Sequence, residues 1–83
     1  MALFRLECGA AKIEIWEVDH GPPHCHISGL DQAGTVVVNL ITLKVTRPPG
    51  LPLPPAVTRC LRDNHVSMLE AWSRVISYPA RKE

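Results

Sequence analysis

Residues 19–26 read DHGPPHCH and concentrate the side chains of this chain that are best suited to chemistry. His20, His24 and His26 lie within seven positions, directly after Asp19. Imidazole is a frequent metal ligand and also exchanges protons near neutral pH. The stretch therefore raises three alternatives: a metal site, an acid–base site, or a histidine-rich turn whose rings bond to one another and to water.

The spacing is compatible with a metal site. If residues 24–28 form a strand, His24 and His26 leave the same face with Cα atoms about 6.6 Å apart. Both rings can then reach one zinc ion at about 2.0–2.1 Å. His20, returned by the Gly-Pro-Pro turn, is the third predicted ligand, and Asp19 is predicted to orient one ring from outside the coordination sphere. Three histidines and an open fourth position resemble a catalytic zinc arrangement.

The same pair of histidines also suits proton transfer without a metal. Two neighbouring histidines can act as general acid and general base, which makes His24 and His26 the catalytic candidates of a metal-independent ribonuclease. Such an enzyme needs a cation for the phosphate, and Arg47 or Arg59 would supply it. The net charge of only +1 gives little support to nucleic acid as a partner.

Protein binding is the leading functional interpretation of the sequence. Trp16 is expected on the sheet face that carries His24 and His26, where an exposed aromatic side chain is a common anchor for a partner. Arg47 is included in this predicted surface. The structural alternative is that Trp16 packs under the proline-rich segment. A small sheet with uncovered edges also favours strand addition or a homodimer.

The size of the chain, 83 residues, predicts a single domain, 1–83. Such a small domain has little room for an enclosed site, so we expect a surface cleft or an exposed sheet face. Cys8, Cys25 and Cys60 are an odd number without close spacing, which predicts reduced thiols rather than a disulfide framework. No apolar run reaches the length of a membrane span, so we expect a cytoplasmic protein with no membrane partner.

Alternation of apolar and polar residues predicts strands near the start of the chain and along its middle. These strands cover residues 4–8, 11–18, 24–28, 35–41 and 43–46. Within residues 24–28, Cys25 and Ile27 should face the core, which leaves the histidines on the other face. Residues 47–55, RPPGLPLPP, contain five prolines and are expected to form a stiff, extended connection.

After the prolines, the apolar residues recur at the spacing of a helix. Pro54-Pro55 suits a first helical turn, because the first amides of a helix have no partner to lose. One apolar stripe then runs through Val57, Leu61, Met68, Trp72 and Val75. His65 lies on this stripe and is expected at the edge of the core, hydrogen-bonded to the backbone. Pro79 is expected to end the helix.

These elements predict an α+β fold in two layers. A small antiparallel sheet of three to five strands occupies residues 1–46, and residues 47–55 form the proline-rich connection. One long C-terminal helix over residues 56–78 packs on one face of the sheet, which gives the order β-β-β-β-α. Short connections favour hairpins over parallel crossovers.

The order of these motifs resembles a family of small bacterial proteins defined only as a domain of unknown function. That family's signature is an acidic residue, H-x-P-P-H-x-H, a hydrophobic strand, a Leu-Pro-Pro segment and a helix ending in tryptophan. The matching residues here are Asp19, His20, Pro22, Pro23, His24, His26, Leu53, Pro54, Pro55, His65 and Trp72. Where the family usually has an aromatic residue, this chain has Cys25.

The resemblance implies a bacterial protein with an α+β fold and no established reaction. Members of that family are often encoded beside a second small protein, in an arrangement like a toxin–antitoxin pair. The resemblance therefore implies a protein partner, with toxin and neutraliser both open as analogies.

Overall fold

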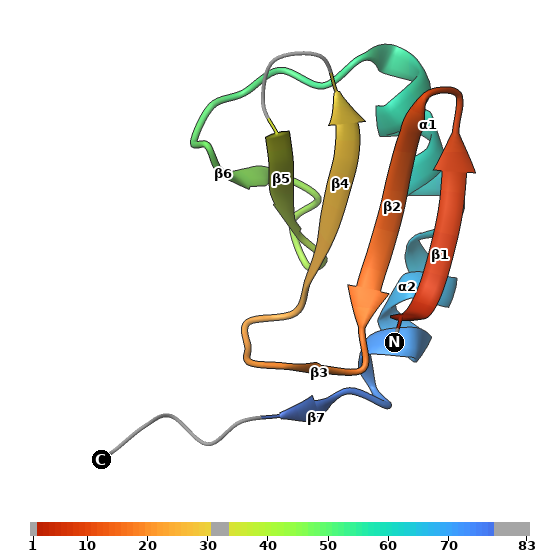
Figure 1. The fold of residues 1–83 in the computed structure, drawn as a ribbon, viewed down its shortest axis with the longest axis vertical. Coiled ribbons are helices and arrows are strands. Elements are labelled where there is room, and N and C mark those ends of the chain that lie inside the picture. The colour runs from red at the N-terminus through yellow and green to blue at the C-terminus, as the bar shows by residue number, and fades with distance from the viewer. Residues whose placement is uncertain (1, 31–33, 78–83) are drawn as a thin grey trace.

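The computed structural model describes residues 2–30 and 34–77 (Figure 1). Five strands form an antiparallel sheet, and two helices lie along one of its faces. In spatial order the strands are β1 (Ala2–Cys8), β2 (Ala11–Trp16), β4 (His24–Leu30), β5 (Gly34–Asn39) and β6 (Val45–Arg47), and the helices are α1 (Pro55–Asp63) and α2 (His65–Trp72). The predicted α+β class with an antiparallel sheet is confirmed.

A second, two-stranded sheet lies at one end of the molecule (Figure 1). It pairs β3 (Val18–Asp19) with β7 (Ile76–Ser77) in parallel. The sequence shows no pattern that predicts this sheet, because two-residue strands are too short to show a period. Because of this pairing, residues 76–77, which follow α2, lie beside residues 18–19, which precede the histidines.

Strand alternation places the core between the main sheet and the helices. The buried side chains of the strands and helices form one cluster, which includes Ile13, Ile15, Cys25, Ile27, Val36, Val38, Val57, Leu61, Met68 and Ala71. Each large apolar side chain buried in this way contributes about 1.5–3 kcal/mol to folding. His24 and His26 lie on the opposite, open face of the sheet, because they alternate with Cys25 and Ile27.

The prediction of one long helix over residues 56–78 is wrong. The helix breaks at Asn64, whose φ of −111° and ψ of 15° leave the helical region. The Cys60 carbonyl oxygen accepts two hydrogen bonds from Asn64, one from its backbone amide at 3.0 Å and one from its side-chain Nδ2 at 2.9 Å, so the last turn of α1 closes on this residue. After the break, His65 Nε2 donates to the Leu40 carbonyl oxygen at 2.5 Å. The predicted backbone hydrogen bond of His65 is therefore confirmed.

The chain leaves α2 at Trp72 rather than continuing as a helix. Backbone hydrogen bonds from Arg74 to Ala71 and from Val75 to Trp72 turn the chain, and β7 follows. Pro79, which was predicted to end the helix, lies outside the described residues. Neither described helix has the length and hydropathy that a membrane-spanning helix needs.

The prediction of three reduced cysteines is wrong for two of them. Cys8, at the end of β1, and Cys60, on α1, form a disulfide bond, while Cys25 is free and buried. The bonded residues lie 52 positions apart, and only the packing of α1 against β1 brings them together. Spacing in the sequence therefore gave no sign of the pair. Burial raises the pKa of the Cys25 thiol to about 12, which makes it a poor nucleophile.

Reduction of the Cys8–Cys60 disulfide should lower the free energy of unfolding by about 4 kcal/mol, because the unfolded chain regains the entropy of the open loop. Urea unfolding of the oxidised and reduced protein measures this difference. A Cys8→Ala, Cys60→Ala double variant is the control and should not respond to the reductant. Equal unfolding midpoints for the oxidised and reduced protein would contradict the prediction.

Candidate functional site

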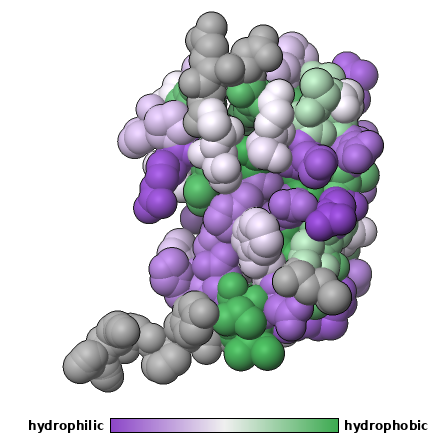
Figure 2. All heavy atoms as spheres, in the orientation of Figure 1, coloured by the Kyte–Doolittle hydropathy of each residue, from purple (hydrophilic) through white to green (hydrophobic). Residues whose placement is uncertain are grey.

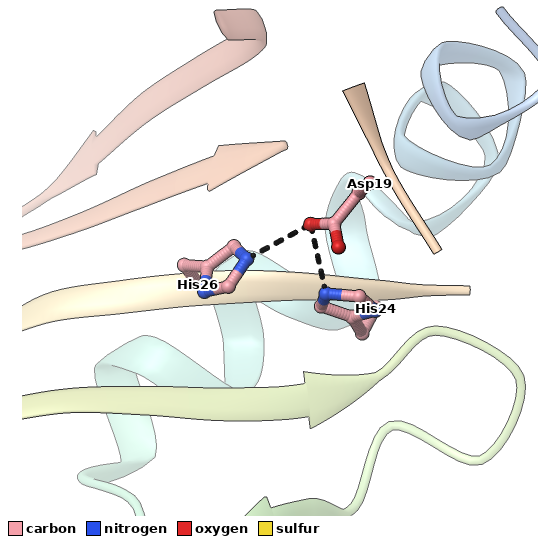
Figure 3. A group of neighbouring side chains, drawn as sticks. All are labelled: Asp19, His24 and His26. Atoms are coloured by element: carbon pink, nitrogen blue, oxygen red, sulfur yellow. Dashed lines mark hydrogen bonds and ion pairs between the residues drawn. The ribbon is translucent and has the colours of Figure 1, made fainter. Parts of the chain in front are cut away.

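Asp19, His24 and His26 converge where β4 begins (Figure 3). The Asp19 Oδ2 atom lies 3.0 Å from His24 Nε2 and 3.2 Å from His26 Nε2. The two imidazole rings are 4.9 Å apart between centroids and meet edge to face. The prediction that both rings project together on the face away from the core is confirmed. They are not fully solvated, since their side chains are 12% and 23% exposed.

Strand pairing on both sides of β4 holds the two histidines. His26 pairs with Glu14 of β2 on one side and with Val37 of β5 on the other. His24 pairs with Asn39 of β5. His26 is therefore held from both sides, whereas His24, at the start of β4, is held from β5 and lies before the part of β4 that pairs with β2.

Asp19 reaches the histidines from β3, across the turn that contains Gly21, Pro22 and Pro23. Its Oδ1 atom accepts a hydrogen bond from the His20 backbone amide at 2.8 Å, which leaves Oδ2 to face the rings. Partial burial raises the pKa of the Asp19 carboxyl, but the His20 amide, the hydrogen bond to His26 and the charges of both histidines outweigh this. The net pKa therefore lies below its ordinary value of 3.8.

The hydrogen bond of His24 to the turn determines which ring nitrogen carries hydrogen. His24 Nδ1 lies 2.8 Å from the Pro22 carbonyl oxygen, which can only accept, so Nδ1 must be the donor. In the neutral ring the lone pair is then on Nε2, which faces Asp19 Oδ2 at 3.0 Å. Two electron-rich atoms at this distance repel each other unless a positive charge lies between them. A second proton on His24 or a metal ion provides that charge.

Two tryptophans flank the pair of imidazoles. The Trp16 ring lies 5.7 Å from the His26 ring, and the Trp72 ring lies 5.2 Å from the His24 ring, between centroids. Aromatic surface on both sides removes water from the histidines, and it strengthens electrostatic interactions within the cluster. Trp16 is itself exposed on the sheet face that the sequence predicted.

The structure does not bring the remaining predicted site residues into this cluster. His20 lies beside the cluster but outside the group of three: its side chain is 69% exposed, its Nδ1 lies 3.4 Å from Asp19 Oδ1, and its ring lies 6.4 Å from the His24 ring between centroids. Arg47 is exposed on β6, two strands from β4. Arg59 is on α1, in the helical layer that covers the other face. Neither arginine therefore supplies the phosphate-binding cation beside the pair that a ribonuclease would need.

Asp19, His24 and His26 are the described residues whose side chains could hold a metal ion together. One ligand atom from each lies within 4.8 Å of the other two. The group contains Asp19 in place of the predicted His20, and its carboxylate lies as close to the two rings as a ligand atom would. The position of Asp19 depends on the pairing of β3 with β7, which no local pattern in the sequence predicts.

Comparison with known proteins adds no relative from which a function could be transferred. No protein-family model, curated protein or solved structure matches this chain. The function therefore has to be argued from the geometry of the site itself.

Asp19 should make the stability of the metal-free protein depend on pH in acid. Since its pKa is lower in the folded than in the unfolded chain, its contribution is complete above the unfolded value and is lost as the pH falls through the folded value. In chelator, wild-type protein should lose more stability below about pH 4 than Asp19→Asn, which cannot titrate. Urea unfolding at a series of pH values measures both proteins. Parallel losses in the two proteins would refute the prediction.

Proposed function

We propose that the protein binds a divalent transition metal ion, zinc, through Asp19, His24 and His26. The observation that supports this is the approach of one carboxylate oxygen to both Nε2 atoms, at 3.0 and 3.2 Å. Ligand atoms at adjacent corners of a tetrahedral or octahedral shell with bonds of about 2.1 Å lie about 3.0–3.4 Å apart. The carboxylate–imidazole distances already fit that range.

The surroundings of the ligands support the same proposal. The bond from His24 Nδ1–H to the Pro22 carbonyl fixes the tautomer whose Nε2 lone pair is free for a metal, as outer partners of metal-bound histidines commonly do. A cation also removes the repulsion between that lone pair and Asp19 Oδ2. The His20 backbone amide holds the other carboxylate oxygen, so the carboxylate is oriented before any ion binds.

Three protein ligands would leave at least one coordination position for water. Two histidines and a carboxylate with an open position are typical of catalytic zinc sites and of non-haem iron sites. Zinc lowers the pKa of a bound water to about 7 and makes it a nucleophile, so a hydrolytic reaction is the chemistry this arrangement favours. His20, exposed beside Asp19, would face substrate at the open side.

Calorimetric titration of the untagged, chelator-treated protein should show about one zinc ion per chain. Asp19→Ala and His24→Ala should each weaken binding by at least about 100-fold, since removing a ligand exceeds the usual cost of losing an outer partner. His20→Ala is the matched control and should bind as the wild type does, because its ring lies outside the three-ligand group. Loss of binding in His20→Ala alone, or no binding by the wild type, would contradict the proposal.

Protein binding is the second function that an observation favours. Trp16, Val18 and Ile76 are exposed, with 63% of Ile76 accessible, although all three are large and apolar. Figure 2 shows hydrophobic atoms gathered at the end of the molecule where β3 and β7 lie. Exposed apolar surface of this kind marks interaction sites. It supports the proposal that the protein pairs with a second small protein, as in a toxin–antitoxin-like arrangement, or with a second copy.

Light scattering on the purified protein, alone and mixed with the protein encoded beside it, tests this second proposal. A complex or a dimer is expected, and Trp16→Ser should weaken it by about tenfold or more, as loss of an aromatic anchor does. Val66→Ser is the control, because Val66 is also an exposed apolar side chain, 70% against 41% for Trp16, but lies on α2. Monomers in every mixture would exclude the proposal.

A further inference from the structure

The candidate metal site is built from two parts that are held very differently. His24 and His26 are on β4, which is hydrogen-bonded to β2 and β5. Asp19 is on β3, which is not part of the main sheet and has only two residues. The position of the carboxylate therefore depends on whatever holds β3 in place.

Among the described strands, β7 is the one that pairs with β3. Val18 pairs with Ile76 and Asp19 with Ser77, in parallel. The Ile76 backbone amide donates to the Glu17 carbonyl oxygen at 2.9 Å, just before β3 begins. The backbone of β7 thus sets the position of the residues from which the Asp19 side chain projects.

This pairing is short and lightly packed. Isolated two-stranded pairs are only marginally stable in water. The apolar pair that faces across the two strands, Val18 and Ile76, is 37% and 63% exposed, so little apolar surface is buried there. Local opening with a small free-energy cost is expected for an element with so few contacts.

A second contact links the same end of the chain to the histidines. The Trp72 ring, at the end of α2, packs on the His24 ring at 5.2 Å between centroids. The turn of residues 73–75 connects Trp72 to β7 through the bonds from Arg74 and Val75. β7 therefore starts from a point that is itself anchored on the site, which limits where the strand can dock.

We propose that β7 is a positioning strand for the metal site, and that its docking against β3 and metal binding stabilise each other. The inference rests on the proposed metal-binding function. Docked β7 holds Asp19 over the two histidines and presents a complete ligand set, whereas undocking leaves only the histidine pair. The backbone amide of Ile76 is the positioning group, since it makes the bond to Glu17.

The coupling acts in both directions. If docking raises the affinity for zinc by some factor, bound zinc favours the docked state by the same factor. A partner that captures β7 would then release the metal, and bound metal would protect β7 from capture. The site thereby gains a means of regulation that does not require any change in the main sheet.

The test compares zinc affinity in Ile76→Pro and Ile76→Ala. Proline removes the amide that donates to Glu17, and alanine keeps it while removing a side chain that is mostly exposed. We expect Ile76→Pro to weaken zinc binding by at least about tenfold and Ile76→Ala by no more than about twofold. In an Asp19→Ala background, Ile76→Pro should have no further effect, because the group that the strand positions is gone.

Amide hydrogen exchange in the wild-type protein gives a second measurement that needs no variant. Saturating zinc should slow exchange of the Ile76 amide by at least about tenfold, and it should not do so in Asp19→Ala. The inference is overturned if Ile76→Pro binds zinc as tightly as wild type, if it weakens Asp19→Ala equally, or if zinc leaves the Ile76 amide unaffected. Wild-type protein that fails to bind zinc would instead overturn the proposed function, and the inference with it.

Discussion

The site depends on one electrostatic constraint, which is that a single carboxylate oxygen faces two imidazole nitrogens. Asp19 Oδ2 lies close to both Nε2 atoms, and the Pro22 carbonyl requires hydrogen on the far nitrogen of His24. His26 Nε2 can donate a hydrogen bond to Oδ2, but the contact of His24 with Oδ2 is favourable only with a positive charge between the two atoms. The prolines of the turn, the pairing of β4 and the docking of β7 keep Asp19 Oδ2 close to the two Nε2 atoms, although the contact with His24 requires a positive charge.

The two faces of the main sheet have different roles: one packs against the helices, and the other carries the candidate site. The helix-facing side holds the whole buried cluster, and the disulfide between Cys8 and Cys60 closes a long loop across it. A domain of this size has a small core and a thin margin of stability. The covalent link helps such a core to support, on the opposite face, the cluster of Asp19, His24 and His26.

The hydrophobic periodicity of the sequence predicted the regular strands and helical segments, and it did not predict the irregular features of the fold. Alternation and the density of β-branched residues predicted a sheet of three to five strands, and alternation predicted the common face of His24 and His26. The stripe of Val57, Leu61 and Met68 was predicted correctly, but the break at Asn64 was missed, because it leaves the apolar spacing unchanged, and Val75 lies in the turn after α2. The disulfide and the position of Asp19 beside the two rings depend on contacts between distant segments, and neither spacing nor composition contains that information.

The most direct test of the metal-binding claim is a crystal structure of the zinc-treated protein with anomalous diffraction measured at the zinc edge. The account predicts one zinc ion at about 2.0–2.2 Å from Nε2 of His24, Nε2 of His26 and a carboxylate oxygen of Asp19, with Nδ1 of His24 still bonded to Pro22. No anomalous peak at this cluster, or a zinc ion held by His20 in place of Asp19, would contradict it.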